Sequence, residues 1–416
     1  MPNPSSAATP PLEFTPYQKM VVALLAFLQF TIILDFMILS PLGPILMPAL
    51  SIDTHQFGLV VSAYAFSAGI SGIIAAGFAD RFDRKRMLMV FYAGFLFGTF
   101  LCGIAPTYGF LLVARIVAGL FGGVIGAINF AIVADLFPLA VRGRAMGSIQ
   151  SAFAASQVLG IPIGLMLATH FGWHGPFLLI VGLGLFVGIF ILWKLQPMTS
   201  HLHQAPLGRH PLLHLWKIGT NRRYLVGFSA TMLVATGGFM LQPFSSNFIV
   251  HNLGVSLKAL PLLFVATGVV GIFAGPLMGR LADQYGKFRL LVGATLACVA
   301  VLIWWTHLGI TPLWLAIVGN CVLFATISGR IVGSTTLISG VPELRDRGAY
   351  MSISSSMQQF AGAVSSWVAG LIVVEAPGGR IENFDVLGWV VIGAMMVTLV
   401  QMRAVDRMVK ATAAVS

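Results

Sequence analysis

The chain has 416 residues, of which 57% are hydrophobic and only 9% are charged, and its formal net charge is +11. Soluble domains carry about 25% charged residues, so this composition excludes a soluble globule and indicates a protein whose main solvent is the lipid bilayer. The three cysteines, Cys102, Cys298 and Cys321, lie in apolar segments and show neither disulfide nor metal-ligand spacing.

Residues 1–17 are rich in proline and contain no basic residue. A secretory signal needs a basic start, so we expect a disordered cytoplasmic tail instead. Beyond it, apolar runs of about 20 residues are expected to cross the hydrocarbon as helices. Twelve such runs follow in chain order, at residues 18–40, 55–79, 87–105, 108–137, 144–168, 175–195, 223–248, 257–280, 289–307, 312–340, 349–374 and 385–404.

Basic residues predict the orientation of these helices. If the first residue is inside, 20 of the 24 Lys and Arg fall in inside loops and tails, and only Lys258 and Arg380 fall outside. This asymmetry places both termini in the cytoplasm. It also accounts for the net charge without a nucleic-acid partner, because basic loops face anionic lipid headgroups.

The longest interruption between apolar runs predicts how the chain is divided. Residues 196–222 form a cytoplasmic linker between two six-helix bundles, at 18–195 and 223–404, and a cytoplasmic tail follows at 405–416. Four histidines lie in the linker, but their spacing matches no compact ligand set, so we expect no metal there.

The two predicted bundles share an internal repeat with an offset of 203 residues. The loop "GFADRFDRKRM" aligns with "GRLADQYGKFR", and the same offset carries Arg142 onto Arg345. In the first helix of each half it carries Asp35 onto Gly238. Agreement at three separate places predicts a duplication, with a binding site between the two halves.

This organisation resembles the major facilitator superfamily, whose loop signature between the second and third helices is G-x-L-x-D-R-x-G-R-K/R. The first half keeps Asp80 and the basic residues but has Asp83 at the second glycine. The resemblance implies an all-α integral membrane protein, with two homologous six-helix bundles around a central cavity, that works as a monomer by alternating access. The second half fits the signature at Gly279, Leu281, Asp283, Gly286 and Lys287.

Two further segments resemble proton-coupled members of this superfamily. In the fourth span, Arg115 and Gly119 match the signature L-x-x-x-R-x-x-x-G. In the fifth span, Gly160, Pro162 and Gly164 resemble the antiporter motif G-P-x-x-G-G with one residue inserted. The resemblance implies the drug- and sugar-efflux branch, with Pro162 bending its helix. Close helix packing is the alternative explanation for the glycines.

The resemblance also implies a cytoplasmic gate that holds the two halves together. Asp80 and Asp283 end helices beside clustered basic residues, which stabilise a carboxylate there. Alternatively, the basic residues only enforce the topology. The residues assigned to the gate are Asp80, Arg81, Arg84, Arg142, Asp283, Lys287 and Arg345.

An acid, Asp35, lies deep in the first apolar run, and Arg115 lies at a comparable depth in the fourth. Burial disfavours a charged carboxylate, whereas a nearby guanidinium favours it. A cargo that displaced Arg115 would therefore change the proton affinity of Asp35. We expect Asp35 to face water between the bundles and to carry the proton, with Arg115 as its modulator. The alternative is a static ion pair, although Gly238 at the repeat position indicates that the fold needs no acid there.

Arg330 in the tenth span is the third charge inside the membrane. Either Arg330 caps carbonyls and pairs with a polar neighbour, or it faces the cavity, which then contains one Asp and two Arg. That balance favours neutral, polar or anionic cargo. The amides in the spans either contact cargo or bond between helices. Our candidate cargo contacts are Phe36, Met37, Asn129, Gln157, Phe239, Gln242, Asn247, Asn320, Arg330 and Gln358.

Together these features predict a transporter in the cell inner membrane that exports small organic molecules, such as drugs, sugars or metabolites, in exchange for protons. We expect no cofactor besides the proton gradient. The alternative is a proton symporter or a uniporter that imports a metabolite. A non-transporting sensor or a membrane enzyme is a remote alternative, because no set of catalytic groups converges on one membrane face.

Overall fold

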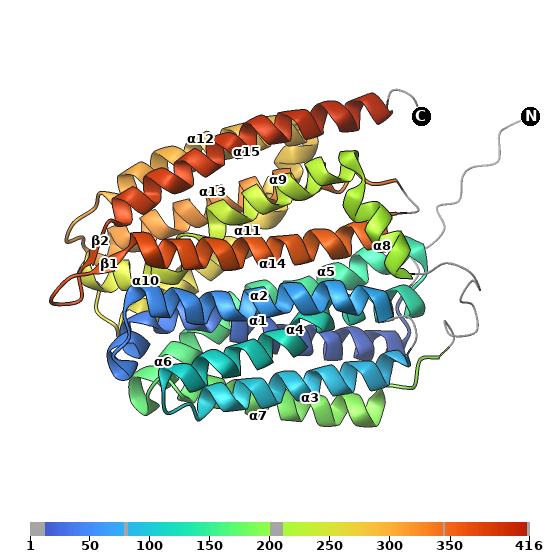
Figure 1. The fold of residues 1–416 in the computed structure, drawn as a ribbon, viewed down its shortest axis with the longest axis horizontal. Coiled ribbons are helices and arrows are strands. Elements are labelled where there is room, and N and C mark those ends of the chain that lie inside the picture. Colours follow the sequence, from blue (N-terminus) through green and yellow to red (C-terminus); the bar gives the residue numbers. More distant parts are fainter. Residues whose placement is uncertain (1–12, 79–81, 200–210, 344–345, 414–416) are drawn as a thin grey trace, which may run out of the picture.

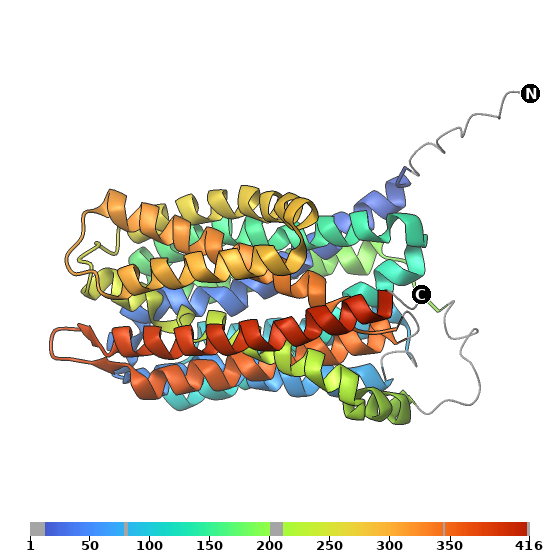
Figure 2. The same ribbon diagram turned by 90° about the horizontal axis from the view of Figure 1, so that it is seen from above.

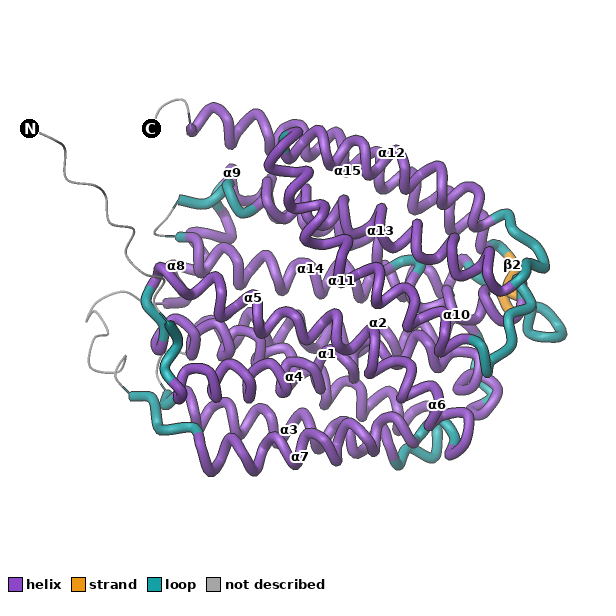
Figure 3. Tube along the Cα trace, turned by 180° about the vertical axis from the view of Figure 1, so that it is seen from behind, coloured by secondary structure: helices purple, strands orange, loops and turns teal. Residues whose placement is uncertain are grey.

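The structure is a computed structural model that describes residues 13–78, 82–199, 211–343 and 346–413. Its long helices run lengthwise in one bundle (Figure 1). The first helix begins and the last helix ends at the same end of the bundle, which we call the termini end (Figure 2). A short antiparallel pair, β1 (Val374–Glu375) with β2 (Ile381–Glu382), marks the opposite end, which we call the hairpin end (Figure 3).

The first half of the chain begins with an unusually long helix, α1, which spans Pro16–Leu50 and extends beyond the expected end at residue 40. A capping box between Thr15 and Gln18 starts it. The elements that follow are α2 (Thr54–Phe78), α3 (Arg84–Gly103), α4 (Tyr108–Leu136), α5 (Leu139–Ala155), a π-helical turn η2 (Ser156–Gly160), α6 (Ile161–Phe171) and α7 (Gly175–Lys194).

The second half differs from expectation at its first helix. The run predicted at 223–248 is two helices, α9 (Arg222–Phe239) and α10 (Gln242–His251), because the chain turns at Met240 and Leu241. Within the predicted linker lies α8 (Pro211–Thr220), which contacts α2 and α14. The remaining helices are α11 (Leu260–Tyr285), α12 (Lys287–Thr306), α13 (Leu313–Ile338), α14 (Arg347–Ile372) and α15 (Phe384–Ala413).

Eleven helical segments within the described residues are long and apolar enough to cross a membrane, with α5–η2–α6 and α9–α10 each counted as one. Helix α14 falls outside this set because it carries serines and glutamines along its length, as its sequence RGAYMSISSSMQQF shows. It nevertheless runs beside α2 in the middle of the bundle (Figure 1). With α14 included, the number of membrane helices is the predicted twelve.

Contacts between the two halves close the hairpin end. The hydroxyl of Thr54 on α2 donates to the carbonyl of Val373 at 2.6 Å. Nearby, α2 and α14 approach so closely that a Cβ added at Gly58 would lie 2.9 Å from the carbonyl oxygen of Ser366. Helix α1 packs on α10 in the same region, where the Ser40 hydroxyl donates to the carbonyl of Gln242. These bonds must break before the hairpin end can open.

Candidate functional site

The structure places Arg115 beside Asp35. Helix α1 carries Asp35 and α4 carries Arg115, and the Nη1 atom of Arg115 donates to Asp35 Oδ2 at 2.9 Å. The same nitrogen donates to the backbone carbonyl of Asp35 at 3.3 Å. Thr107 starts α4 by accepting a hydrogen bond from the amide of Phe110, which sets the level at which Arg115 enters the bundle. A charge-assisted bond of this length is among the stronger contacts between helices.

Two further side chains complete this cluster, and the sequence analysis missed both. Thr99 on α3 donates its hydroxyl hydrogen to the Oδ1 atom of Asp35 at 3.1 Å. The ring of Tyr64 on α2 lies under Arg115, with the guanidinium carbon 4.5 Å from the ring centroid. Such cation–π contacts are worth about 2 kcal/mol when desolvated. Four helices of the first half, α1 to α4, therefore meet at Asp35 and Arg115.

The expectation that Asp35 faces water is wrong for this structure. Both Asp35 and Arg115 have 0% exposure. The reason is local packing: Thr99, Tyr64 and Arg115 come from three neighbouring helices and close around the carboxylate. One donor of the pair is unsatisfied: the Nε atom of Arg115 is buried and has no hydrogen-bond partner within the described residues. Charging and discharging Asp35 therefore needs a rearrangement of this cluster.

The cluster nevertheless lies one residue from the boundary between the halves. Phe36, next to Asp35, packs on Tyr64 at 5.6 Å between ring centroids and on Phe239 of α9 at 5.7 Å. Both Phe36 and Phe239 are half-buried. Aromatic contacts of this kind prefer tilted or edge-to-face rings, as found here. A movement of α9 would thus reach the neighbour of Asp35 directly.

Most of the candidate cargo contacts are engaged within the protein or buried. Asn129 donates to Gln29 at 3.0 Å, and Asn320 donates to Thr267 at 2.7 Å. Asn247 donates to the sulfur of Met47 across the halves at 3.2 Å. Met37 and Gln157 are also buried, Gln242 is half-buried, and Gln358 is exposed. The structure therefore supports the alternative role of bonds between helices for Asn129 and Asn320.

The glycines of the fifth span pack against α1 on either side of Asp35. A Cβ added at Gly160 would lie 2.7 Å from a methyl of Leu34, and one at Gly164 would lie 2.6 Å from a methyl of Ile38. The helix is interrupted by the π-helical turn η2, which ends at Gly160, two residues before Pro162 in the first turn of α6. Pro162 has no amide hydrogen to continue the ladder, so the irregular turn falls where a regular one would fail.

The assigned gate residues fall into three groups. Asp80, Arg81 and Arg345 lie outside the described residues. Asp283 and Lys287 are exposed, and neither forms an ion pair within the part of the chain that the structure describes.

Arg84 and Arg142 make contacts inside the first half. Arg84 pairs with Asp135 of α4 at 3.3 Å, a partner that the sequence analysis missed. Arg142 donates to the carbonyls of Phe137 and Ala134, which the end of α4 leaves unpaired. These bonds fix the start of α3 and the first turn of α5 to the end of α4. The gate role of both arginines stays a prediction.

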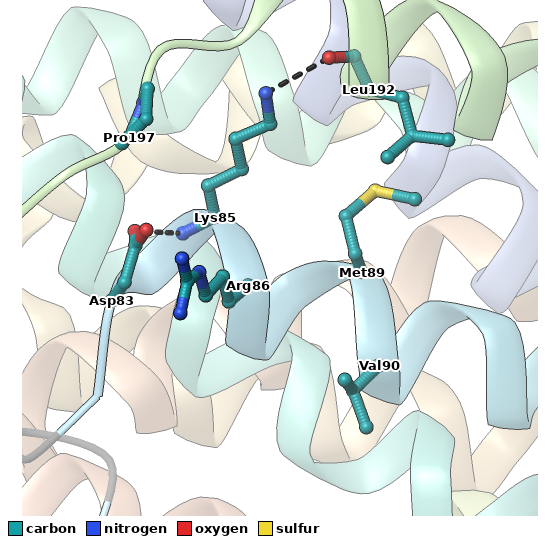
Figure 4. A pocket seen from close by; sticks show the side chains of 7 residues that line it. All are labelled: Asp83, Lys85, Arg86, Met89, Val90, Leu192 and Pro197. Carbon is teal, nitrogen blue, oxygen red and sulfur yellow. Dashed lines mark hydrogen bonds between the residues drawn. The ribbon is translucent and has the colours of Figure 1, made fainter.

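A hollow of about 400 Å³ lies at the termini end, between the start of α3 and the segment that follows α7 (Figure 4). Asp83 starts α3 by accepting from the amide of Lys85, and it also accepts from the amide of Met198. Lys85 donates to the carbonyl of Leu192 at 2.9 Å. The segment after α7 is thereby fastened to the start of α3. Asp83 thus supplies a helix cap at the position where the loop signature has glycine.

Comparison with known proteins identifies the family. The sequence profile of the Major Facilitator Superfamily matches residues 25–366 and 227–412. The chain belongs to this superfamily. Its members of known role are transporters, so the protein is a multi-pass membrane transporter of small molecules rather than an enzyme. Proteins of this family usually act as monomers.

Similar sequences include two Bacillus subtilis (strain 168) proteins. The chain is 26% identical to the uncharacterized MFS-type transporter YbcL over 370 residues, which cover 88% of this chain and 92% of YbcL. It is 29% identical to the uncharacterized MFS-type transporter YceJ over 273 residues, 64% of this chain and 68% of YceJ.

Similar solved structures are also transporters of this superfamily. A bacterial homolog of the human lysosomal transporter Spinster, inward-facing and unoccupied, matches with a TM-score of 0.67 and 17% identity over 95% of this chain and 97% of its own. A D-xylose–proton symporter matches with a TM-score of 0.72 and 15% identity over 92% of this chain and 97% of its own. The nucleoside transporter NupG matches with a TM-score of 0.71 and 16% identity over 93% of this chain and 99% of its own. At these identities the likeness concerns the fold.

Proposed function

We propose that this transporter exports small organic molecules across the cell inner membrane in exchange for protons. The observation that carries the proposal is the Asp35–Arg115 pair, 2.9 Å apart and fully buried. Burying two charges inside a helix bundle costs free energy, so their presence there favours a functional role. The repeat position in the second half is Gly238, so the same fold is built once without the acid.

The geometry supports a simple cycle. In the closed cluster Asp35 is charged and accepts hydrogen bonds from Arg115 and Thr99. Opening of the cluster lets a proton bind to Asp35, and the neutral carboxyl group then releases Arg115. Because Phe36 touches Phe239 of the other half, the opening is coupled to the relative movement of the two bundles. The contacts between α2 and α14 at the hairpin end break when that end opens and form again when it closes.

The orientation of the bundle belongs to the same proposal. With the termini end in the cytoplasm, the hairpin end is the outer face, and this structure is closed towards the outside. The residues assigned to the cytoplasmic gate then belong to the inner face, and we expect the gate to close when the outer face opens.

A second function is a uniporter, in which the ion pair only holds α1 to α4. The complete burial of both side chains favours it. A uniporter equilibrates its cargo and does not respond to a pH gradient, whereas an antiporter accumulates cargo against its gradient.

Uptake into inverted membrane vesicles separates these functions. Vesicles that contain the protein are given an acidic interior, and a panel of radiolabelled drugs, sugars, amino acids and organic acids is tested. We expect accumulation of at least one cargo that collapses when a protonophore removes the gradient. Equal filling with and without the gradient would show a uniporter. Accumulation only under the opposite gradient would show a symporter.

A further inference from the structure

Arg330 is nearly as deeply buried as the arginine of the ion pair, but no acid pairs with it among the described residues. It lies on α13, and its exposed fraction is 3%. Within the described residues it forms no ion pair, and its Nε atom has no hydrogen-bond partner. The thiol of Cys298 on α12 lies beside the guanidinium, and a thiol is a weak acceptor. A buried positive charge without a counter-ion is unfavourable.

The guanidinium of Arg330 points at the glycine pair of α9. A Cβ added at Gly237 would lie 3.3 and 3.4 Å from its two terminal nitrogens. The next residue, Gly238, is half-buried, and a Cβ added there would meet no atom within 4 Å. Gly238 is also the residue that the 203-residue offset places on Asp35. The same offset places Arg115 on Val318, so Arg330 is not its repeat counterpart, but the guanidinium of Arg330 lies beside Gly237, the neighbour of the repeat position of Asp35.

We propose that Arg330 binds an anionic group of the cargo, namely a carboxylate, next to Gly237 and Gly238. The guanidinium offers planar paired donors that match a carboxylate. The room for it is the open space at Gly238, because a Cβ at Gly237 would already contact the guanidinium nitrogens. The cargo supplies in the second half the negative charge that Asp35 supplies in the first. This inference rests on the proposed transport function and narrows its cargo to organic acids.

The charge balance supports the same class of cargo. Asp35 and Arg115 neutralise each other, so Arg330 is the uncompensated charge among these three membrane-buried groups. A cation would be repelled by it. An anion would cancel it and gain strength from the low dielectric of its surroundings.

Thermal unfolding of the full-length protein in detergent provides a test. The probes are benzoate, indole-3-acetate and hexanoate, each paired with its neutral amide. We expect at least one carboxylate to raise the unfolding midpoint of the wild type by several degrees, with no effect of its amide. Arg330→Gln is expected to abolish the shift and Arg330→Lys to retain part of it. Arg403→Gln, which changes an exposed arginine of α15, should retain all of it.

A second variant keeps the proposal testable if Arg330→Gln does not fold. Gly238→Asp provides an internal carboxylate, so it should raise the midpoint without ligand and remove the response to the carboxylate probes. Gly238→Asn, of the same size but neutral, is the control and should not raise the midpoint without ligand.

Three results would overturn the proposal: an unchanged carboxylate shift in Arg330→Gln, stabilisation by amides or amines alone, or an equal shift from sodium chloride. Any of these leaves transport itself intact. Failure of the proposed function would instead show as carboxylate binding without gradient-driven uptake in vesicles.

Discussion

Replacing Asp35 by Asn separates a charge effect from a packing effect, because the two side chains have the same shape. The amide can still accept a hydrogen bond from Thr99, but Arg115 then remains fully buried without a counter-ion. Removing one partner of a buried ion pair costs about 3–5 kcal/mol. We expect Asp35→Asn to lower the free energy of unfolding by that amount, measured by a reversible unfolding titration in mixed micelles.

The reverse substitution should cost less. Arg115→Gln leaves an acid that can neutralise itself by taking up a proton, whereas an arginine cannot lose its proton in a protein. The double variant Asp35→Asn/Arg115→Gln removes both charges and should recover most of the loss. Glu382→Gln, an exposed acid at the hairpin end, is the matched control and should change stability by less than about 0.5 kcal/mol.

The reasoning would be refuted by two results. One is a loss of less than about 1 kcal/mol in Asp35→Asn, which would mean that water or another group already compensates Arg115. The other is a double variant as unstable as the single one, which would mean that shape rather than charge holds the cluster together.

Three further predictions follow from packing, closure and charge. Gly98→Ala would place its Cβ 2.4 Å from the backbone nitrogen of Ala118, so it should lower the free energy of unfolding by roughly 1–3 kcal/mol or more. Gly147→Ala has open space around it. In the same unfolding titration it should be neutral or stabilise by about 0.5–1 kcal/mol. Thr54→Val removes the bond to Val373 and should shift spin-label distances across the hairpin end towards an open state; an unchanged distribution would contradict its role in closure. Partial burial raises the pKa of Glu375 between α14 and α15, although His251 opposes this shift. Its charged form is therefore disfavoured in the folded state, and stability is lost as pH rises through the folded pKa, so Glu375→Gln should stabilise slightly at pH 7 and not at pH 4; the opposite order would disprove it.

The sequence predicted the membrane helices well because each needs about 20 apolar residues, a signal that does not depend on tertiary contacts. The irregular parts were harder to predict. Met240 and Leu241 are apolar, so nothing in hydropathy distinguishes the break between α9 and α10 from a continuous helix. Helix α8 has only ten residues, so it is too short to register as a span.

The candidate site was only partly predictable, since depth along a helix can be read from the sequence but rotation about its axis cannot. The positions of Asp35 and Arg115 along their helices predicted that they lie at the same depth in the membrane. Thr99 and Tyr64 lie in ordinary apolar runs, and only the rotation of α2 and α3 turns them towards the pair. For the same reason the amides were assigned to cargo, whereas Asn129 and Asn320 bond to neighbouring helices.

The central claim is that a proton on Asp35 drives transport, and comparison of two fluxes in proteoliposomes tests it most directly. One is cargo exchange at equal concentrations without a pH gradient, and the other is accumulation driven by a gradient. We predict that Asp35→Asn retains exchange and loses accumulation, while Glu382→Gln retains both. Full gradient-driven accumulation by Asp35→Asn would contradict the account.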